Sequence, residues 1–213
     1  MEPISNLLSG DRLRLAELQD EVIDIIYDRF EPDAVLYGGT AVWRCYGGNR
    51  FSEDIDICMS NTALNKLAAS VSRYGLSLLW RDRELPSIVR IGRGNTSVLL
   101  ESKEGWGENT IRQYVRVDGS STTIRVFTPF EMLVRKVEAY GGRRFIRDIY
   151  DIFILTRFLD KHDHSVASVL LPFLESAVTP EDEGVLKSLI YTGRSDLRFA
   201  DLMQYIGRWL HEV

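Results

Sequence analysis

The stretch Val35–Met59 constrains the fold and the chemistry of this chain more than any other part of it. It opens with a short apolar run, typical of a buried strand, that ends in Gly38–Gly39. Thr40 then caps a predicted helix that begins at Ala41. The first N–H groups of a helix have no partner inside it, so they suit a bound phosphate. The Gly-Gly-Thr turn therefore predicts a phosphate-binding site.

Two aspartates follow on a predicted strand that begins at Asp54. Residues two apart in a strand share a face, so Asp54 and Asp56 point the same way while Ile55 and Ile57 face the core. Adjacent carboxylates repel each other unless a cation lies between them, and Mg²⁺ prefers such oxygen ligands. A phosphate site followed by this pair indicates metal-dependent phosphoryl chemistry on a nucleotide. The alternative is a βαβ turn that carries a surface Asp-x-Asp.

The composition is that of a soluble globular protein. The 213 residues suffice for one large domain or two small ones, with 45% hydrophobic and 27% charged residues. We find no apolar run long enough to span a bilayer and no signal-peptide pattern, so we expect a cytoplasmic protein without membrane contact. Cys45 and Cys58 are too few for a disulfide framework or a zinc site, and we expect both to be packing residues.

The charge balance bears on the partner. A net charge of −5 argues against broad affinity for nucleic acids. Only five of the 26 Lys+Arg are lysines, and arginine suits bidentate phosphate contacts, so a local RNA-binding patch remains open. A GC-rich genome would produce the same arginine bias.

Elsewhere in the N-terminal part, the sequence predicts two more helices, several strands and turns. The helices are Asp11–Arg29 and Asn61–Tyr74, the latter capped by Ser60 or Asn61. The predicted strands are Leu76–Arg81, Ser87–Ile91 and Ser97–Ser102. Turn signals at Glu84–Pro86 and Gly92–Asn95 separate them. A loop with a short strand near Val115 is expected over Glu108–Gly119, before a last strand at Thr122–Phe127.

The pattern changes from strand to helix after Phe127. Thr128, Pro129 and Glu131 form a capping-box signature for a helix that Gly141–Gly142 ends. Further helices are expected up to Leu159 and over Val166–Ala177, Glu181–Tyr191 and Asp201–Leu210. The predicted fold is α/β (α+β): a mixed sheet of about five strands in residues 1–127, flanked by helices, and a helical part in residues 128–213.

Two regions of this sequence resemble a known family. Gly38–Ala41 (Gly-Gly-Thr-Ala) and Arg50–Ile57 (Arg-Phe-Ser-Glu-Asp-Ile-Asp-Ile) resemble the signature of AbiEii/AbiGii-type nucleotidyltransferases, in the DNA-polymerase-β-like superfamily. Lys136 and Arg147–Asp151 (Arg-Asp-Ile-Tyr-Asp) resemble the second conserved region of that family. Its members are mostly toxins of bacterial and archaeal toxin–antitoxin pairs. The motifs span roughly half of the chain.

The resemblance implies transfer of a nucleotide from an NTP to an acceptor hydroxyl, with pyrophosphate released and the nucleotide bound between the two parts. Asp54 and Asp56 would hold two Mg²⁺ ions about 4 Å apart. A third carboxylate from a neighbouring strand completes this site in the superfamily, and Glu101 is the first candidate, with Glu104 the second. Glu101 would complete the metal cluster or act as the base. The alternative is a surface carboxylate, since Leu99-Leu100-Glu101 lacks the lysine of the family's Lys-x-Asp.

Phosphate contacts are expected from both regions. Gly38, Gly39, Thr40 and Ser52 should cradle phosphates. Arg50 is preferred as a nucleotide contact over Arg44, which lies one turn into the helix and has Glu53 or Asp54 as alternative partners.

Lys136 should offset the triphosphate charge, and Asp148 and Asp151, three apart on one helical face, should line the same site. The alternatives are a solvated Lys136 and aspartates that pair with Arg144 or Arg147.

By resemblance the partners are an NTP, a cognate antitoxin and an RNA acceptor such as the 3′ end of a tRNA. Two other enzymatic roles remain open, namely AMP transfer to a protein hydroxyl and nucleotide transfer to a small molecule such as an aminoglycoside. A non-catalytic nucleotide-binding module is less favoured, because both aspartates of the pair are intact.

Overall fold

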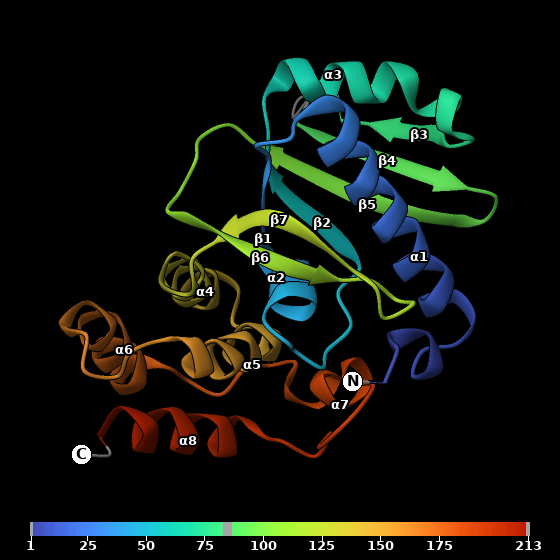
Figure 1. The fold of residues 1–213 in the computed structure, drawn as a ribbon. Helices are drawn as coiled ribbons and strands as arrows, with labels where there is room; N and C mark the ends of the chain where they lie inside the picture. The colour runs from blue at the N-terminus through green and yellow to red at the C-terminus, as the bar shows by residue number, and fades with distance from the viewer. Residues whose placement is uncertain (1, 83–86, 212–213) are drawn as a thin grey trace. The chain divides into compact units, whose positions relative to one another are not determined.

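A computed structural model describes residues 2–82 and 87–211, and the chain divides into two compact units (Figure 1). The first unit comprises Met1–Cys45 and Ser52–Phe127. The second comprises Tyr46–Phe51 and Thr128–Val213, so a six-residue segment from the early part of the chain joins the C-terminal helices. The turn expected at Glu84–Pro86 lies outside the described residues.

The first unit is built on a mixed sheet with the strand order β3-β4-β5-β2-β1-β7-β6. Its strands are β1 (Val35–Tyr37), β2 (Asp54–Cys58), β3 (Ser77–Arg81), β4 (Ile88–Arg93), β5 (Thr96–Lys103), β6 (Asn109–Val115) and β7 (Ser121–Phe127). The pairs β2–β5 and β1–β7 are parallel, and the others are antiparallel. The expected count of about five strands was too low for the described part of the chain, which holds seven.

Strand β6 is the main correction to the predicted sheet. We expected a loop with a short strand near Val115, yet all of Asn109–Val115 pairs with β7. Tyr114 is the one residue of β6 that is fully buried, and Ile111 is 60% exposed. An edge strand that buries so little of its length shows only a weak hydrophobic alternation, which is the signal that predicts strands.

The core of the first unit lies under the face of the sheet that α1 (Gly10–Ile25) and α2 (Gly38–Cys45) contact. The alternate residues of β2 and β5 that face this core, Ile55, Ile57, Val98 and Leu100, are completely buried. All three residues of β1 are buried as well, as expected for a central strand.

The remaining helical segments of the first unit agree with their predicted positions. The helix expected over Asp11–Arg29 is α1, continued by a π-helical turn at Ile26–Phe30. Helix α3 spans Asn61–Ser70, and its cap is Ser60, whose hydroxyl accepts the Ala63 N–H.

The second unit consists of helices and the segment Tyr46–Phe51, which we call the docked loop. Its α-helices are α4 (Pro129–Arg143), α5 (Ile146–Leu155), α6 (His164–Ser176), α7 (Leu186–Leu189) and α8 (Phe199–His211). The capping box is confirmed, because the Thr128 side chain accepts the Glu131 N–H. Gly141–Gly142 does not end α4. Arg144 ends it in the left-handed conformation, with φ of 53°. The helix predicted over Glu181–Tyr191 is reduced to a 3₁₀ turn and the four residues of α7.

The segment Tyr46–Phe51 is fixed in the second unit by backbone hydrogen bonds. The Phe51 N–H donates to the Leu189 carbonyl at 2.9 Å, and the Tyr191 N–H donates to the Asn49 carbonyl at 3.1 Å. Between them Arg50 forms an isolated antiparallel bridge with Ile190. No described helix combines the length and the apolar character that crossing a membrane requires.

Candidate active site

The aspartate pair lies on β2 as the alternation of the sequence predicted. Asp54 and Asp56 are partly exposed, whereas Ile55 and Ile57 between and after them are completely buried. Both carboxylates therefore belong to the face of the sheet opposite the core that α1 and α2 cover.

Glu101 lies beside this pair on the neighbouring strand. Strands β2 and β5 run parallel, and Asp56 is the direct register partner of Glu101. Residues paired in this way project from the same face, on strands about 4.8 Å apart. The Glu101 carboxylate is 4.0 Å from the Lys103 Nζ. Glu104, the second candidate, instead accepts the Asn61 N–H at the start of α3, at 3.1 Å.

These residues provide the right ligand chemistry for Mg²⁺, which prefers carboxylate oxygens. Within the described ranges, however, no three His, Cys, Asp or Glu side chains converge closely enough to hold a metal ion. Asp54, Asp56 and Glu101 lie on one face of the sheet, and Asp56 is in register with Glu101.

Gly38 brings the backbone of the Gly-Gly-Thr turn against the carboxylate of Asp56. Its φ is +73°, and a Cβ built on it would lie 1.9 Å from the Asp56 Oδ2. A side chain at this position is therefore excluded both by conformation and by space. The turn and the carboxylate pair, which the sequence places sixteen residues apart, meet at this contact.

Thr40 links the same two elements from inside the core. The helix begins at Gly38 rather than Ala41, so the expectation that Thr40 is its cap was wrong. Thr40 is completely buried, and its hydroxyl donates to the backbone carbonyl of Asp54 at 2.5 Å. Gly39 beside it is buried too, and the partly buried Ser52 accepts a 2.9 Å hydrogen bond at its carbonyl from the Gln19 side chain.

Arg44 does not pair with Glu53 or Asp54. It is 1% exposed, its guanidinium lies 3.0 Å from Asp20, and it also donates to the carbonyls of Ala16 and Val115. Burial raises the pKa of Asp20, although the charge of Arg44 opposes this shift. Arg44 thus joins α1 to α2 inside the core and is not available to a phosphate.

The other predicted charged residues gather in one buried cluster in the second unit. Arg50 donates through Nε and Nη2 to the two oxygens of Asp151, both at 2.6 Å. The Lys136 Nζ lies 2.6 Å from Asp151 and 3.2 Å from Asp148. Arg143 binds Asp148 through two hydrogen bonds of 2.8 Å. The two aspartates are completely buried, Arg50 is 3% exposed and Lys136 is 7% exposed.

This charge cluster (Arg50, Lys136, Arg143, Asp148 and Asp151) corrects two alternatives. Lys136 is not a solvated surface residue, and the aspartates pair with Arg50, Lys136 and Arg143 rather than with Arg144 or Arg147. The sequence did not single out Arg143, because the two glycines before it were expected to end the helix.

The electrostatics of the cluster favour the ionised form of Asp148. Burial alone would raise the pKa of Asp148, but the hydrogen bond from Arg143 and the charges of Lys136 and Arg143 lower this pKa below its usual value. Three cations face two carboxylates, so one positive charge is in excess. An ammonium group has three N–H donors, and Lys136 directs two of them at the aspartates.

One protein-family model covers the carboxylate face, the Gly-Gly-Thr turn and the charge cluster together. This model, described as nucleotidyl transferase AbiEii toxin, type IV TA system, matches residues 24–198. The chain belongs to the AbiEii family of nucleotidyltransferases.

Solved structures share the fold of this AbiEii protein. MenT4, a nucleotidyltransferase toxin of Mycobacterium tuberculosis, superposes with a TM-score of 0.66 at 14% identity, over 94% of this chain and 83% of MenT4. JHP933 of Helicobacter pylori gives 0.67 at 21% identity, over 95% and 91% of the chains. The antibiotic-resistance factor ANT(2″)-Ia gives 0.50 at 13% identity, over 78% and 94%. No curated protein matches the chain.

Part of the candidate site could not be predicted from the sequence. The contact between Gly38 and Asp56 and the pairing of Arg50 with Asp151 join residues that are far apart along the chain. The only signals for them were the residue types: a glycine before a helix, and charged residues in otherwise apolar segments.

Proposed function

We propose that this AbiEii protein is a Mg²⁺-dependent enzyme that transfers a nucleotide from an NTP to a hydroxyl of an RNA acceptor. In this reaction the acceptor oxygen attacks the α-phosphorus, the bond from that phosphorus to the bridging oxygen breaks, and pyrophosphate leaves. The acceptor proton passes to a nearby base. The observation that supports the proposal best is the alignment of Glu101 with Asp56, on the face that also carries Asp54.

Asp54 and Asp56 are the residues that would hold Mg²⁺, with Glu101 completing the set. When bound, the metal would supply charge stabilisation for the leaving pyrophosphate and would activate the attacking oxygen. If Glu101 is not a ligand, it would accept the proton of the acceptor hydroxyl. Its register next to Asp56 makes it a better candidate than Glu104, which binds the first turn of α3.

Phosphate binding is assigned to the backbone of Gly38 and Gly39 at the start of α2, where N–H groups lack partners inside the helix. Thr40 and Ser52 support this role. The buried hydroxyl of Thr40 fixes β2 against α2, and the backbone of Ser52 is anchored to Gln19.

The charge cluster is assigned to the triphosphate. Lys136 would direct its remaining N–H at a phosphate oxygen, and the excess positive charge would offset the charge that develops on pyrophosphate. Asp148 and Asp151 hold the ammonium in place through the pairs described above, and Arg50 shares this network.

We further propose that the protein acts as the toxin of a type IV-like toxin–antitoxin pair, in line with the description of its family. A cognate antitoxin would then be its partner, and the 3′ end of a tRNA is the acceptor that we favour. An acceptor hydroxyl on a protein or on an aminoglycoside would use the same catalytic residues, so the acceptor must be identified directly.

A transfer assay tests the proposal. The purified protein is incubated with each α-³²P-labelled NTP, with and without Mg²⁺, in the presence of total RNA, total protein or an aminoglycoside panel. We expect label on RNA only, dependent on Mg²⁺. Asp56→Asn should abolish the labelling, whereas Glu53→Gln, which changes an exposed carboxylate just before β2, should not.

Each outcome of this assay decides one part of the proposal. Label on protein or drug would keep the reaction and replace the acceptor. If Asp56→Asn labels RNA as well as the wild type does, the carboxylate pair takes no part in the mechanism. If RNA is labelled without divalent metal, the reaction does not require Mg²⁺.

A further inference from the structure

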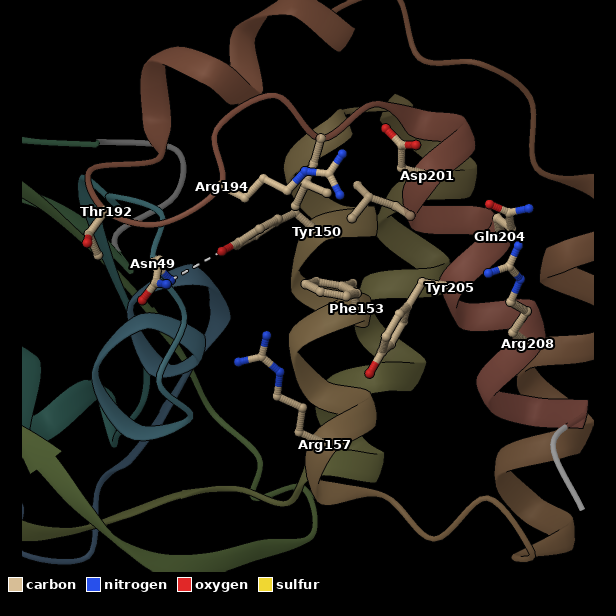
Figure 2. Close-up of a pocket in the computed structure, with 12 residues that line it drawn as sticks. Asn49, Tyr150, Phe153, Arg157, Thr192, Arg194, Asp201, Gln204, Tyr205 and Arg208 are labelled. Atoms are coloured by element: carbon tan, nitrogen blue, oxygen red, sulfur yellow. Dashed lines mark hydrogen bonds between the residues drawn. The ribbon is translucent and has the colours of Figure 1, made fainter.

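A pocket of about 370 Å³ lies within the second unit, apart from the charge cluster (Figure 2). Its walls are the docked loop at Asn49, helices α5 and α8, and the segment between α7 and α8. This volume lies in the range of small-ligand sites. Asn49 and Tyr150 close one end, where the Asn49 N–H donates to the Tyr150 hydroxyl at 3.4 Å.

The lining of this pocket is rich in arginine. Arg157, Arg194 and Arg208 line it, and Asp201 is the only carboxylate among its described lining residues. Arg194 pairs with Asp196 at 2.8 Å, but no residue of the described chain forms an ion pair with Arg157. Arg157 is exposed and lies over the Phe153 ring, 5.3 Å from its centroid. Its guanidinium therefore lies over an aromatic ring, and no carboxylate of the described residues forms an ion pair with it.

Two aromatic rings form a platform beside this guanidinium. Phe153 of α5 and Tyr205 of α8 pack edge to face, with ring centroids 4.7 Å apart. Tyr205 is 42% exposed and lines the pocket beside Phe153 (Figure 2). An exposed ring held by a second ring provides a surface on which a planar group can stack.

The pocket walls are tied together before any ligand binds. The docked loop is fixed to the segment at Leu189–Tyr191 by backbone hydrogen bonds and to α5 by the Arg50–Asp151 pair. Asn49, which lines the pocket, precedes Asp54 by five residues in the sequence. The loop that leads to the catalytic strand thus also forms one wall of the pocket.

We infer that this pocket binds one nucleotide of a single-stranded RNA acceptor, with the base on Tyr205 and the adjacent phosphate on Arg157. The inference rests on the proposed function, because it names the substrate of that reaction. A phosphodiester carries one negative charge, which suits the guanidinium of Arg157, since no carboxylate of the described residues forms an ion pair with it. The side-chain amides of Asn49 and Gln204 also line the pocket, and such groups can donate to and accept from a base edge.

A free NTP fits the pocket less well than a nucleotide within a strand. A metal–triphosphate complex needs several carboxylates and a cradle of backbone N–H groups. The pocket offers one carboxylate, Asp201, whose Oδ2 already accepts the Arg198 N–H at 3.0 Å. The residues suited to an NTP are those on β2, α2 and the charge cluster.

Fluorescence anisotropy tests this inference on the full chain without NTP or metal. The probe is a fluorescein-labelled single-stranded RNA of about ten nucleotides, within the range of known strand-binding sites. Because the whole protein carries a net charge of −5, binding is measured first at low salt and then along a salt series.

We expect Tyr205→Ala to weaken binding by about fivefold or more, since it removes a stacking ring. Tyr205→Phe keeps the ring and should bind within about threefold of the wild type. Arg157→Glu should weaken binding by about tenfold or more. It should also reduce the slope of log affinity against log salt concentration by about one, the value for one lost phosphate contact. Arg144→Glu is the matched control, because Arg144 is an exposed arginine of the same unit that does not line the pocket.

Thermal melting of each variant shows that the second unit is folded. Unchanged RNA affinity in both Arg157→Glu and Tyr205→Ala would overturn the inference. Equal weakening by Arg144→Glu would also overturn it, because binding would then depend on charge alone. Competition by AMP or ATP as strong as that by the unlabelled strand would mean a site for free nucleotides instead.

The binding assay separates this inference from the proposed reaction. Asp56→Asn should abolish transfer and leave RNA affinity unchanged, since it lies outside the pocket. If no RNA is labelled by the wild type while Arg157→Glu still loses RNA binding, the reaction fails and the site stands. If RNA is labelled and the pocket variants label it at the wild-type kcat/KM, the site fails and the reaction stands.

Discussion

Single residues decide whether the carboxylate face of β2 keeps its geometry, and Gly38 is the most sensitive of them. Gly38→Ala should lower transfer activity and the Tm together, because the added Cβ would overlap the Asp56 carboxylate. Gly94→Ala is the control, since Gly94 has a φ of +57° but open space around its Cβ position. Both variants bear the strain of a left-handed alanine, about 1 kcal/mol. The excess loss in Gly38→Ala, measured by melting and by kcat/KM, therefore reports the contact with Asp56.

Lys136 lies between structural and catalytic roles, and the two are separable. If its free N–H contacts the triphosphate, Lys136→Met should cost about 2–4 kcal/mol of transition-state stabilisation, a loss of roughly 30- to 1,000-fold in kcat/KM. Arg135→Met, at the preceding position and paired with Glu131, should change kcat/KM little. A large fall in Tm at unchanged kcat/KM would restrict Lys136 to the packing of the charge cluster.

Asp148 makes the stability of the second unit sensitive to acid. Its pKa is lowered in the folded protein, so the stabilisation is fully present above the unfolded pKa of about 3.9. It is lost as the pH falls through the lower, folded pKa. Asp148→Asn should therefore reduce the Tm at pH 6. The difference in Tm between this variant and the wild type should shrink as the pH falls below about 4. The exposed Asp28→Asn should show no such convergence, and a constant Asp148→Asn deficit down to pH 2.5 would contradict this explanation.

At the scale of elements, the docked loop Tyr46–Phe51 depends on one buried ion pair. Removing one partner of such a pair costs about 3–5 kcal/mol, because the other charge stays buried. Because the Lys136 Nζ stays 2.6 Å from Asp151, we expect Arg50→Met to cost the lower end of this range in urea unfolding. The double variant with Asp151→Asn should cost less than the sum of the two single losses. Arg194→Met breaks an exposed pair with Asp196 and should cost less than about 1 kcal/mol. Additive losses for Arg50→Met and Asp151→Asn would show that the pair is not coupled.

Elements with strong local signals were predicted correctly from the sequence. Strand β1, the alternating β2 and the capped start of α4 each carry their information in adjacent residues. Strand β6 was underestimated, because its place is set by pairing with β7 rather than by its own residues. The end of α4 was misplaced, because packing of Arg143 on Asp148 carries the helix through Gly141–Gly142.

In the candidate site too, local patterns were predictable from the sequence and long-range contacts were not. Asp54 and Asp56 could be placed on one face by periodicity alone, and the register with Glu101 adds what no local pattern contains. The charge cluster joins residues up to 101 positions apart, so the sequence supplied its members without their partners. The Arg44–Asp20 pair was missed for this reason too, since both residues look like ordinary members of helical surfaces.

At the scale of the whole molecule, the assignment to a toxin family predicts an effect on cells. Expression of the wild type without a partner should slow the growth of a bacterial host, and Asp56→Asn should relieve the effect at equal protein level. Growth curves with immunoblots measure both quantities. Glu53→Gln should remain as inhibitory as the wild type. Normal growth at high levels of enzymatically active protein would contradict the toxin role and leave the reaction intact.

The second unit is built from two segments that are far apart in the sequence, and this affects how the protein folds during its synthesis on the ribosome. Arg50 is synthesised 101 residues before Asp151. At 5–20 residues per second, its guanidinium waits about 5–20 s for the carboxylate that neutralises it. The Asn49 carbonyl waits longer still, for the Tyr191 N–H. A nascent chain therefore cannot form the contacts of this loop until most of the chain has been translated. Ribosomes that stall before that point should release only inactive fragments.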